Sequence, residues 1–443
     1  MDKKKLTLIF VWIPIILLGV INLLTVFTPE IGFDALWYHL TLPKLWLFKQ
    51  QWFFDGGLLY YSAMPRLTET IFIPLIKLTD FIGPKLVQYL SGIGISIFIW
   101  KILTKQNIST TLKSLGVSLF YCTWLVSWQS GSAYIDLFRT LLETIALFYF
   151  TSGSWKKGGL FLGLAVGTKW FAIGSVFIYS FVFGFPLMII SFLLSLPWFI
   201  ISFVYTSNPI YPIFSPVLNQ SFLPLGTIIK NIFLLPLTIT FPSDDFISPM
   251  VGILVVLSTL AIFSRHKIIR KVSLIGLMGA IFSVVINPPS SRFFLPFLPA
   301  LVIASVYVVS LLKNSFQKFF IFLVIISSHL ILGLRMIAID KYFPFLLGRE
   351  TQTEFLTRHS DRLPDTFIDS DNFVRDHISP GSKILIDKLH NLYYFPYNFD
   401  HTSWVKDHGD YDYFITKGAK PSEIKGDLLH TNSLGIQIYK LTK

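Results

Sequence analysis

The chain has 443 residues, of which 53% are hydrophobic and only 14% are charged. Soluble proteins carry about 25% charged residues, so this composition excludes an ordinary soluble enzyme and predicts a polytopic membrane protein. The net charge of +12 is spread between hydrophobic runs and forms no continuous stripe, which favours anionic lipid over nucleic acid as its partner. The single cysteine, Cys122, excludes an internal disulfide framework.

Apolar runs recur along residues 1–340 and predict membrane helices, since a span needs about 20 apolar residues. In chain order the runs are Leu6–Phe27, Leu67–Ile82, Leu86–Leu103, Leu112–Trp128, Leu137–Phe150, Leu160–Tyr205, Pro249–Phe263, Val272–Ile286, Phe293–Leu312 and Phe319–Ile339. The first follows three lysines and lacks a small-residue cleavage site, so it is expected to remain as an anchor. The block Leu160–Tyr205 is broken at Gly167-Thr168-Lys169 and at Gly184-Phe185-Pro186 and predicts three short helices. The whole predicts a mainly α bundle of about 10–13 spans.

Basic residues between the runs predict the orientation, because cytoplasmic loops carry an excess of Lys and Arg. The basic loops are Lys3–Lys5, Trp155–Lys157, Arg265–Lys271 and Lys313–Lys318. The stretches that then lie outside the cytoplasm are 28–66, 207–248, 287–292 and everything after 340. Lys101–Lys113 also reads as cytoplasmic, which leaves one crossing after Arg66. The run Leu67–Ile82 is therefore either a re-entrant segment that does not cross the membrane, or a place where the bias of basic residues toward the cytoplasm fails.

From about Lys341 the composition becomes polar and charged. Strand-like runs occur at Lys383–Ile386, Tyr411–Ile415 and Gly435–Leu441, separated by Pro, Gly, His and Asp. We therefore expect a transmembrane domain over residues 1–340, with its first outer loop at 28–66, and a small extracytoplasmic α/β domain over residues 341–443. The small domain has no Gly-rich phosphate loop, which argues against nucleotide binding.

The stretch after the first span, Glu30–Lys44, places one carboxylate among aromatic and basic groups. Asp34 stands at the head of a short helical run, where its side chain is well placed to cap the helix. Tyr38 and His39 follow it, and a run of this kind tends to lie in the headgroup layer. We expect a carboxylate at the membrane boundary, beside a histidine and two lysines. A plain N-cap in an amphipathic surface helix is the alternative.

Four further ionisable residues lie in or beside predicted spans, where a charge is costly and is a candidate for function. Asp136 opens a span on the outer side and reads as a second acid or as a helix cap. Lys169 interrupts an apolar helix pair and reads as an anion ligand or as a snorkelling side chain. Arg292, at the outer mouth of a late span, suits a phosphate or a lipid headgroup. Glu69 is a substrate-binding candidate unless it pairs with Arg66.

No metal-ligand spacing is present, neither His-Glu-x-x-His nor Asp-x-Asp, so the sequence predicts no metal site and no cofactor. Two scattered carboxylates leave the use of a divalent cation open. No Gly-x-Ser-x-Gly motif is present either, which argues against acyl transfer.

In this order and at these membrane depths, the motifs resemble those of the GT-C superfamily of integral-membrane glycosyltransferases. The likeness is to the bacterial branch around glycosyltransferase family 39, with the protein O-mannosyltransferases and the aminoarabinose transferase of lipid A as relatives. The matching motifs are Gly32-Phe33-Asp34 with Tyr38-His39, Asp136 at a span start, Gly163 to Lys169, Ser207 to Pro212, and Arg292 to Pro296. The resemblance covers most of the membrane part.

The resemblance implies a hexosyl- or pentosyltransferase of a bacterial inner membrane. Its donor would be a sugar on a polyprenyl phosphate, and its acceptor a lipid, a glycan or a protein. The resemblance places the catalytic base on Asp34, with Asp136 as the second candidate acid. The residues then expected to bind substrate are Tyr38, His39, Glu69, Lys169 and Arg292. Many relatives have two adjacent acids, whereas here Phe33 and Ala35 flank Asp34.

The chemistry of such a transfer agrees with these residue types. The leaving group is a phosphate, so cations such as Lys169 and Arg292 would stabilise the charge that it develops. The acceptor hydroxyl must lose a proton, which a nearby carboxylate can take. Direct displacement by the acceptor would invert the anomeric centre.

Two other classes of protein stay open. A transporter or flippase of lipid-linked glycans should show two similar halves with matched broken helices. The chain has one broken block, Leu160–Tyr205, and an appended domain, which favours the transferase. An inactive membrane scaffold predicts that Asp34 and Lys169 are replaceable.

Overall fold

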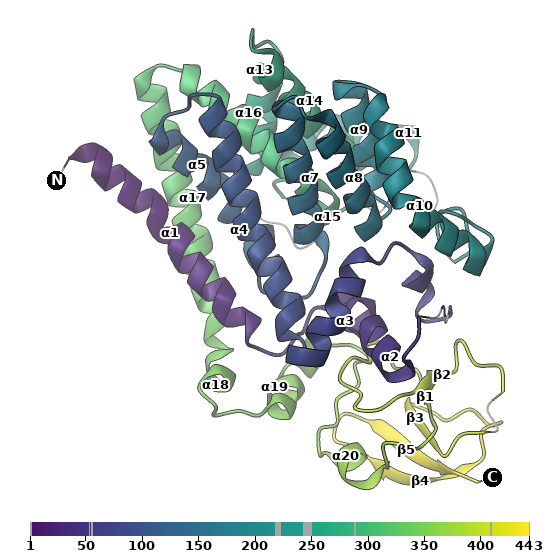
Figure 1. The fold of residues 1–443 in the computed structure, drawn as a ribbon. Helices are drawn as coiled ribbons and strands as arrows, with labels where there is room; N and C mark the ends of the chain where they lie inside the picture. Colours follow the sequence, from purple (N-terminus) through teal and green to yellow (C-terminus); the bar gives the residue numbers. More distant parts are fainter. Residues whose placement is uncertain are drawn as a thin grey trace.

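The computed structural model describes residues 2–52, 54, 56–217, 223–241, 250–287, 289–407 and 410–442. In this part of the chain a bundle of helices forms the main body, and a small β-sheet lies at one end, here called the sheet end (Figure 1). Within the described residues, six helices are long and apolar enough to cross a membrane, namely α1 (Lys3–Val26), α4 (Ile82–Lys105), α10 (Pro186–Thr206), α14 (Lys267–Val285), α15 to α16 (Ser291–Leu311) and α17 (Asn314–Asp340). The predicted mainly α membrane bundle is confirmed.

Shorter helices complete the bundle, namely α5 (Thr110–Tyr121), α6 (Trp124–Gln129), α7 (Asp136–Thr151), α8 (Trp155–Thr168), α9 (Ala172–Phe183) and α13 (Val251–Ala261). The block Leu160–Tyr205 forms α8, α9 and α10, as its two breaks predict. The first break falls where Lys169 leaves the helix in extended backbone, and the second where Gly184 adopts a φ of 119°.

The predicted span Leu112–Trp128 is wrong as one continuous helix. It forms α5 and α6, which meet at Cys122 and Thr123. Thr123 has extended backbone angles, with φ −78° and ψ 146°, and its hydroxyl donates to the carbonyl of Phe120 at 2.9 Å. A threonine hydroxyl that bonds the local backbone competes with helix continuation, which explains the break.

The run Leu67–Ile82 is not among the six long helices. It forms α3 (Leu67–Thr79), which ends where Asp80 adopts a positive φ of 55°. Helix α3 lies beside α2 (Thr41–Lys49) at the sheet end, and α4 alone runs from there to the opposite end (Figure 1). Among the described residues from Arg66 to Lys101, α4 is therefore the one helix long and apolar enough to cross a membrane, and the side on which each loop lies stays a prediction.

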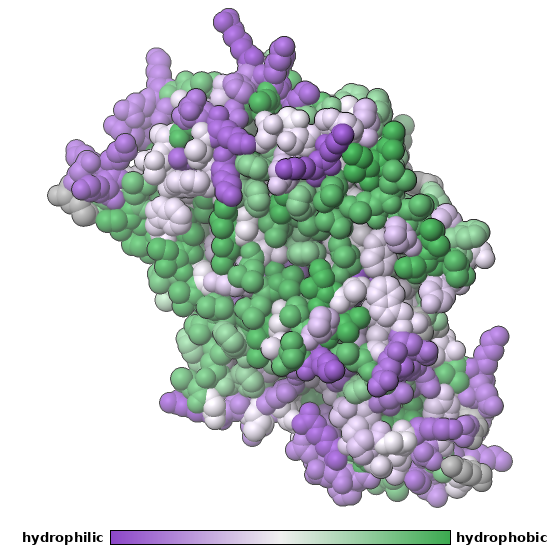
Figure 2. All heavy atoms as spheres, in the orientation of Figure 1, coloured by the Kyte–Doolittle hydropathy of each residue, from purple (hydrophilic) through white to green (hydrophobic). Residues whose placement is uncertain are grey.

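Short helices join these elements, namely η1 (Ala35–His39), η2 (Tyr60–Ala63), α11 (Leu225–Phe233), α12 (Leu235–Thr238), η3 (Leu295–Phe297), α18 (Phe343–Leu346), α19 (Gln352–Arg358), η4 (Ser360–Arg362) and α20 (Phe373–His377). The surface of the bundle is an apolar belt between two polar ends (Figure 2). Large side chains of the belt are exposed, such as Val204 at 71% and Ile337 at 75%. Such a continuous apolar surface suits contact with lipid and not with water.

The C-terminal sheet has five strands, namely β1 (Ile384–Asp387), β2 (Asp400–His401), β3 (Tyr413–Lys417), β4 (Gly426–Thr431) and β5 (Ile436–Leu441). Their order is β2-β1-β3-β5-β4, with β1 parallel to β2 and β3, and β5 antiparallel to β3 and β4. The three strand-like runs correspond to β1, β3 and β5. The sequence pattern missed β2, which has two residues, and β4, whose side chains are mostly exposed.

Helix α2 and the sheet share one hydrophobic core. Leu42, Leu45 and Trp46 are buried with the sheet residues Ile386 and Ile415. The sheet therefore covers the apolar face of α2, and the position of this stretch in the headgroup layer stays a prediction. The catalytic candidate loop and the C-terminal sheet pack as one unit.

The two lysines expected beside Asp34 hold the C-terminal part of the chain instead. Lys44 Nζ donates to the carbonyl oxygens of Tyr393 and Phe395 at 2.6 and 2.9 Å. Lys49 Nζ lies 3.0 Å from Asp400 Oδ1. The expected position of both lysines beside Asp34 was therefore wrong. Nothing in the sequence near the lysines indicates that their partners lie more than 300 residues away.

Candidate active site

A cavity of about 140 Å³ lies where the first outer loop meets the bundle. Its walls come from five segments: the loop around η1, the segment from η2 to α3, the start of α7, the junction of α8 and α9, and the start of α15. The predicted site residues that line it are Asp34, Tyr38, His39, Lys169 and Arg292. Asp136 and Glu69 do not line the cavity but bond directly to residues that do. The fold therefore brings all seven predicted residues together.

Arg292 joins two carboxylates at the centre of this site. Its Nε donates to Asp136 Oδ2 at 2.8 Å, and its Nη1 makes an ion pair with Asp34. Its guanidinium carbon lies 4.5 Å from the ring centre of Tyr134. The helix that carries it, α15 (Ser291–Phe294), is capped by Ser290, whose hydroxyl accepts from the Arg292 backbone N–H at 3.3 Å. The remaining nitrogen, Nη2, has no hydrogen-bond partner in the described structure.

Asp136 is the counter-ion of both candidate cations. It is 1% exposed and accepts hydrogen bonds from Lys169 Nζ at 2.8 Å and from Gln129 Nε2 at 3.1 Å, besides the bond from Arg292. Its side chain makes no helix-capping bond, since it is the first residue of α7 and follows the N-cap Ile135. The reading of Asp136 as a helix cap is wrong. Its oxygens are occupied by cations, so a buried structural charge describes it better than a free acid.

Lys169 is positioned by the close packing of α8 against α10. A Cβ on Gly163 would lie 2.7 Å from the carbonyl oxygen of Ser191, so only glycine lets the two backbones approach in this way. Directly after α8 the chain turns out of the helix at Lys169, and the side chain reaches Asp136. Lys169 is 8% exposed, so the snorkelling alternative is wrong.

Asp34 does not cap a helix, and that prediction is wrong. Its backbone is already helical, with φ −63° and ψ −33°, and its side chain makes no capping bond to η1. The carboxylate instead turns to Arg292, since an arginine at this distance compensates a buried charge better than one backbone N–H. Burial raises the pKa of Asp34, but the charge and hydrogen bond of Arg292 outweigh burial, with smaller help from Lys169, so the pKa lies below its ordinary value.

His39, Glu69 and Arg66 form a buried chain beside Asp34. His39 Nδ1 donates to Glu69 Oε1 at 2.7 Å, and Arg66 Nη1 donates to the same oxygen at 2.9 Å. Burial lowers the pKa of His39 below its ordinary value, although Glu69 partly opposes this shift, so the ring is neutral at neutral pH. Glu69 therefore pairs with Arg66, the alternative to its predicted role in substrate binding.

Several nitrogens around the cavity have no hydrogen-bond partner in the described structure. They are His39 Nε2, the Nε and Nη2 of Arg66, and Arg292 Nη2. The guanidinium of Arg66 also lies 5.4 Å from the ring centre of Tyr38. Free arginine nitrogens beside a neutral histidine suit an anionic ligand with several oxygens, such as a phosphate.

Sequence reasoning missed Arg66, Tyr61 and Tyr134 as parts of the site. Arg66 was assigned only to Glu69, but two of its nitrogens remain free and it lines the cavity. Its place just before an apolar run, as for Arg292, is the signal that could have found it. Among the described residues, no group of three or more His, Cys, Asp or Glu side chains could hold a metal ion.

The chain matches no family model and no curated protein. Two solved structures share its fold, both of ArnT from Cupriavidus metallidurans. The crystal structure bound to undecaprenyl phosphate superimposes with a TM-score of 0.66, and the apo crystal structure with 0.62. In each case 99% of this chain and 98% of ArnT are covered, at 11% sequence identity. The chain therefore has the polytopic membrane fold of ArnT, and the GT-C type fold that its motifs predicted is confirmed.

Proposed function

We propose that this protein is a membrane glycosyltransferase that moves a sugar from a polyprenyl-phosphate donor to a lipid, glycan or protein acceptor outside the cytoplasm. The observation that carries the proposal is the cavity itself, where the Asp34 carboxylate lies beside Arg292, Lys169 and Arg66. The fold of ArnT, which was crystallised with undecaprenyl phosphate, supports this choice of donor.

The cations of the cavity suit the leaving phosphate. The free nitrogens of Arg66 and Arg292 can donate to phosphate oxygens while Asp136 holds Lys169 and the other side of Arg292 in place. Negative charge grows on the phosphate as its bond to the sugar breaks, so fixed donors stabilise the transition state more than the ground state.

Asp34 serves as the general base in this proposal. It takes the proton of the acceptor hydroxyl, the acceptor oxygen bonds to the anomeric carbon, and the bond from that carbon to the phosphate oxygen breaks. Polyprenyl phosphate leaves, and the anomeric centre inverts. A low pKa makes Asp34 a weak base, so its effect comes mainly from its position next to the reacting hydroxyl.

The C-terminal domain covers the loop that carries Asp34. The His390 ring stacks on Phe33 at 4.9 Å between ring centres and lies 4.3 Å from Trp37. The Tyr394 hydroxyl donates to the carbonyl of Glu30 at 2.8 Å. These contacts fix the loop on both sides of Asp34 and limit the access of water, which would otherwise compete as acceptor.

Purified protein in detergent tests the proposal, with a radiolabelled polyprenyl-phosphate sugar as donor and extracted envelope lipids, glycans and proteins as acceptors. Transfer should release one polyprenyl phosphate for each sugar transferred. It should proceed in detergent, because the reaction does not need a bilayer. A transporter would leave the donor intact in detergent. An unchanged donor with all three acceptor classes would refute the transferase.

Lys169→Gln and Arg292→Gln are each expected to weaken binding of the donor by about 1–3 kcal/mol, the scale of a hydrogen bond to a charged group. Equilibrium binding of a fluorescent polyprenyl-phosphate sugar would measure the loss. Lys77→Gln is the matched control, since Lys77 is exposed on α3 and outside the cavity. Normal donor binding by both cavity variants would show that the two cations serve only as counter-ions of Asp34 and Asp136.

A further inference from the structure

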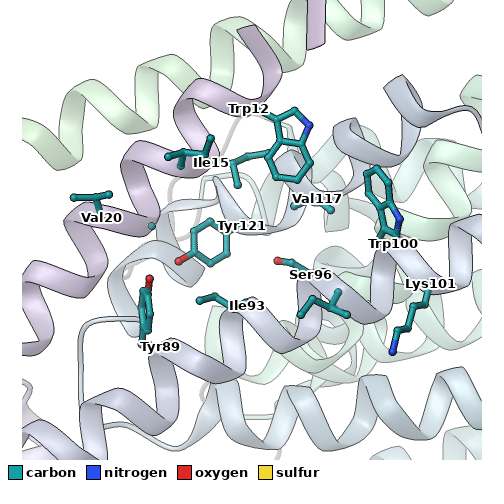
Figure 3. Close-up of a pocket in the computed structure, with 13 residues that line it drawn as sticks. Trp12, Ile15, Val20, Tyr89, Ile93, Ser96, Trp100, Lys101, Val117 and Tyr121 are labelled. Carbon is teal, nitrogen blue, oxygen red and sulfur yellow. The ribbon is translucent and has the colours of Figure 1, made fainter. Parts of the chain in front are cut away.

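A larger cavity of about 600 Å³ lies on the lipid-facing side of the bundle, between α1, α4 and α5. Its lining is almost wholly apolar, and Figure 3 shows it extending from Val20 and Tyr89 at one end to Trp100 and Lys101 at the other. Helices α1 and α4 converge toward the sheet end and separate toward the opposite end (Figure 1). The cavity is the groove that this separation leaves, and we call it the α1–α4 groove.

The α1–α4 groove is open to the surrounding bilayer. Ile16, Val20 and Ile97 on its rim are 58%, 50% and 49% exposed. Its wall also carries the hydroxyl groups of Tyr89, Ser96 and Tyr121 (Figure 3). An open apolar groove of this size at membrane depth suits one hydrocarbon chain that enters sideways from the lipid.

Positive charge gathers at the end of the groove that is farthest from the sheet. Lys101 lines the groove, and Lys113 Nζ lies 4.6 Å from the ring centre of Trp100, which also lines it. The sequence from residue 81 to 135 contains no Asp or Glu. Among the described residues, no carboxylate forms a salt bridge with Lys101, Lys105 or Lys113. This end of the α1–α4 groove therefore has cations that no described carboxylate neutralises.

We propose that the α1–α4 groove binds one anionic phospholipid, with an acyl chain along the groove and the phosphate at Lys101 and Lys113. The lysines supply charge complementarity to an anionic headgroup, and the groove supplies the apolar surface for the chain. A lipid held in this way has its phosphate at the end opposite the sheet. It cannot place that phosphate at Arg292, so this lipid is not the sugar donor. The site is independent of the proposed transferase activity.

The test is native mass spectrometry of the purified full-length protein, titrated with phosphatidylglycerol or with phosphatidylcholine. Wild-type protein should retain one phosphatidylglycerol in preference to phosphatidylcholine. Gly19→Leu should abolish this binding, because Gly19 lines the groove and a side chain there meets only the Tyr121 hydroxyl, at 3.9 Å. The matched control is Gly333→Leu on α17, where a new side chain also finds open space but not the groove.

A second pair of variants tests the headgroup. Lys101→Gln and Lys113→Gln should each reduce the preference for phosphatidylglycerol by about fivefold, because this is the contribution of one lysine to binding an anionic headgroup. The control Lys318→Gln, on α17, should leave the preference unchanged. Equal binding of the two lipids by wild-type protein would overturn the proposal. So would full binding of phosphatidylglycerol by Gly19→Leu, since the bound lipid would then belong to the general lipid shell. Donor binding measured in parallel reports separately on the catalytic cavity.

Discussion

Asp34→Asn is expected to lower the rate of sugar transfer by about 10²–10⁴-fold, the usual contribution of a positioned general base. The substitution keeps the shape and one accepting oxygen but removes the proton acceptor. It also removes the negative partner of one Arg292 nitrogen, while Asp136 continues to hold the other side of that guanidinium. The protein should therefore fold and still bind the donor.

The pH profile gives an independent reading of the same residue. Because Arg292 holds the pKa of Asp34 below its ordinary value, the carboxylate stays ionised at neutral pH. A carboxylate with a lowered pKa loses its charge only when the pH falls below the ordinary carboxylate range. Wild-type transfer that depends on ionised Asp34 should therefore persist through mildly acidic pH, provided the donor and acceptor remain bound.

Purified Asp34→Asn that transfers sugar within a few-fold of the wild-type rate would contradict the assignment. His39 would then be the residue to test, because its Nδ1 donates to Glu69 and its Nε2 remains without a partner in the described structure. Asp136 is a poorer second choice as base, since Lys169 and Arg292 occupy its oxygens.

Asp136→Asn is expected to destabilise the protein by about 3–5 kcal/mol, the cost of removing one partner from a buried ion pair. The carboxylate is 1% exposed and balances two cations, so the variant leaves both Lys169 and Arg292 with less compensation. The loss exceeds that of an ordinary hydrogen bond because a charge in low dielectric surroundings has no water to solvate it.

Reversible unfolding in mixed micelles at increasing SDS fraction would measure this loss. Asp340→Asn is the matched control, since Asp340 is exposed at the end of α17 and forms none of the described ion pairs. An unfolding free energy of Asp136→Asn equal to that of the control variant would show that Asp136 is not a structural counter-ion. The Asp136 carboxylate would then again be a candidate for the catalytic base.

The positions of most helices could be predicted from the sequence. Helices α1, α7 and α17 follow the runs Leu6–Phe27, Leu137–Phe150 and Phe319–Ile339 to within a few residues at most ends. In lipid every backbone polar group must be satisfied internally, so an apolar run of sufficient length has almost no choice other than a helix. The break at Gly184 followed equally from the residue, because glycine readily adopts a positive φ before a proline-started helix.

The choice of site residues also followed from the sequence, because a charge beside an apolar run is costly and needs a reason. Their partners did not follow. Asp136 lies 33 residues from Lys169 and 156 from Arg292, and Asp34 lies 258 residues from Arg292. The local pattern around Asp34 favoured a helix cap, but its carboxylate pairs with Arg292, which is distant in the sequence. A buried charge must find an opposite charge, but only the packing of α8, α15 and the first outer loop decides which one it meets.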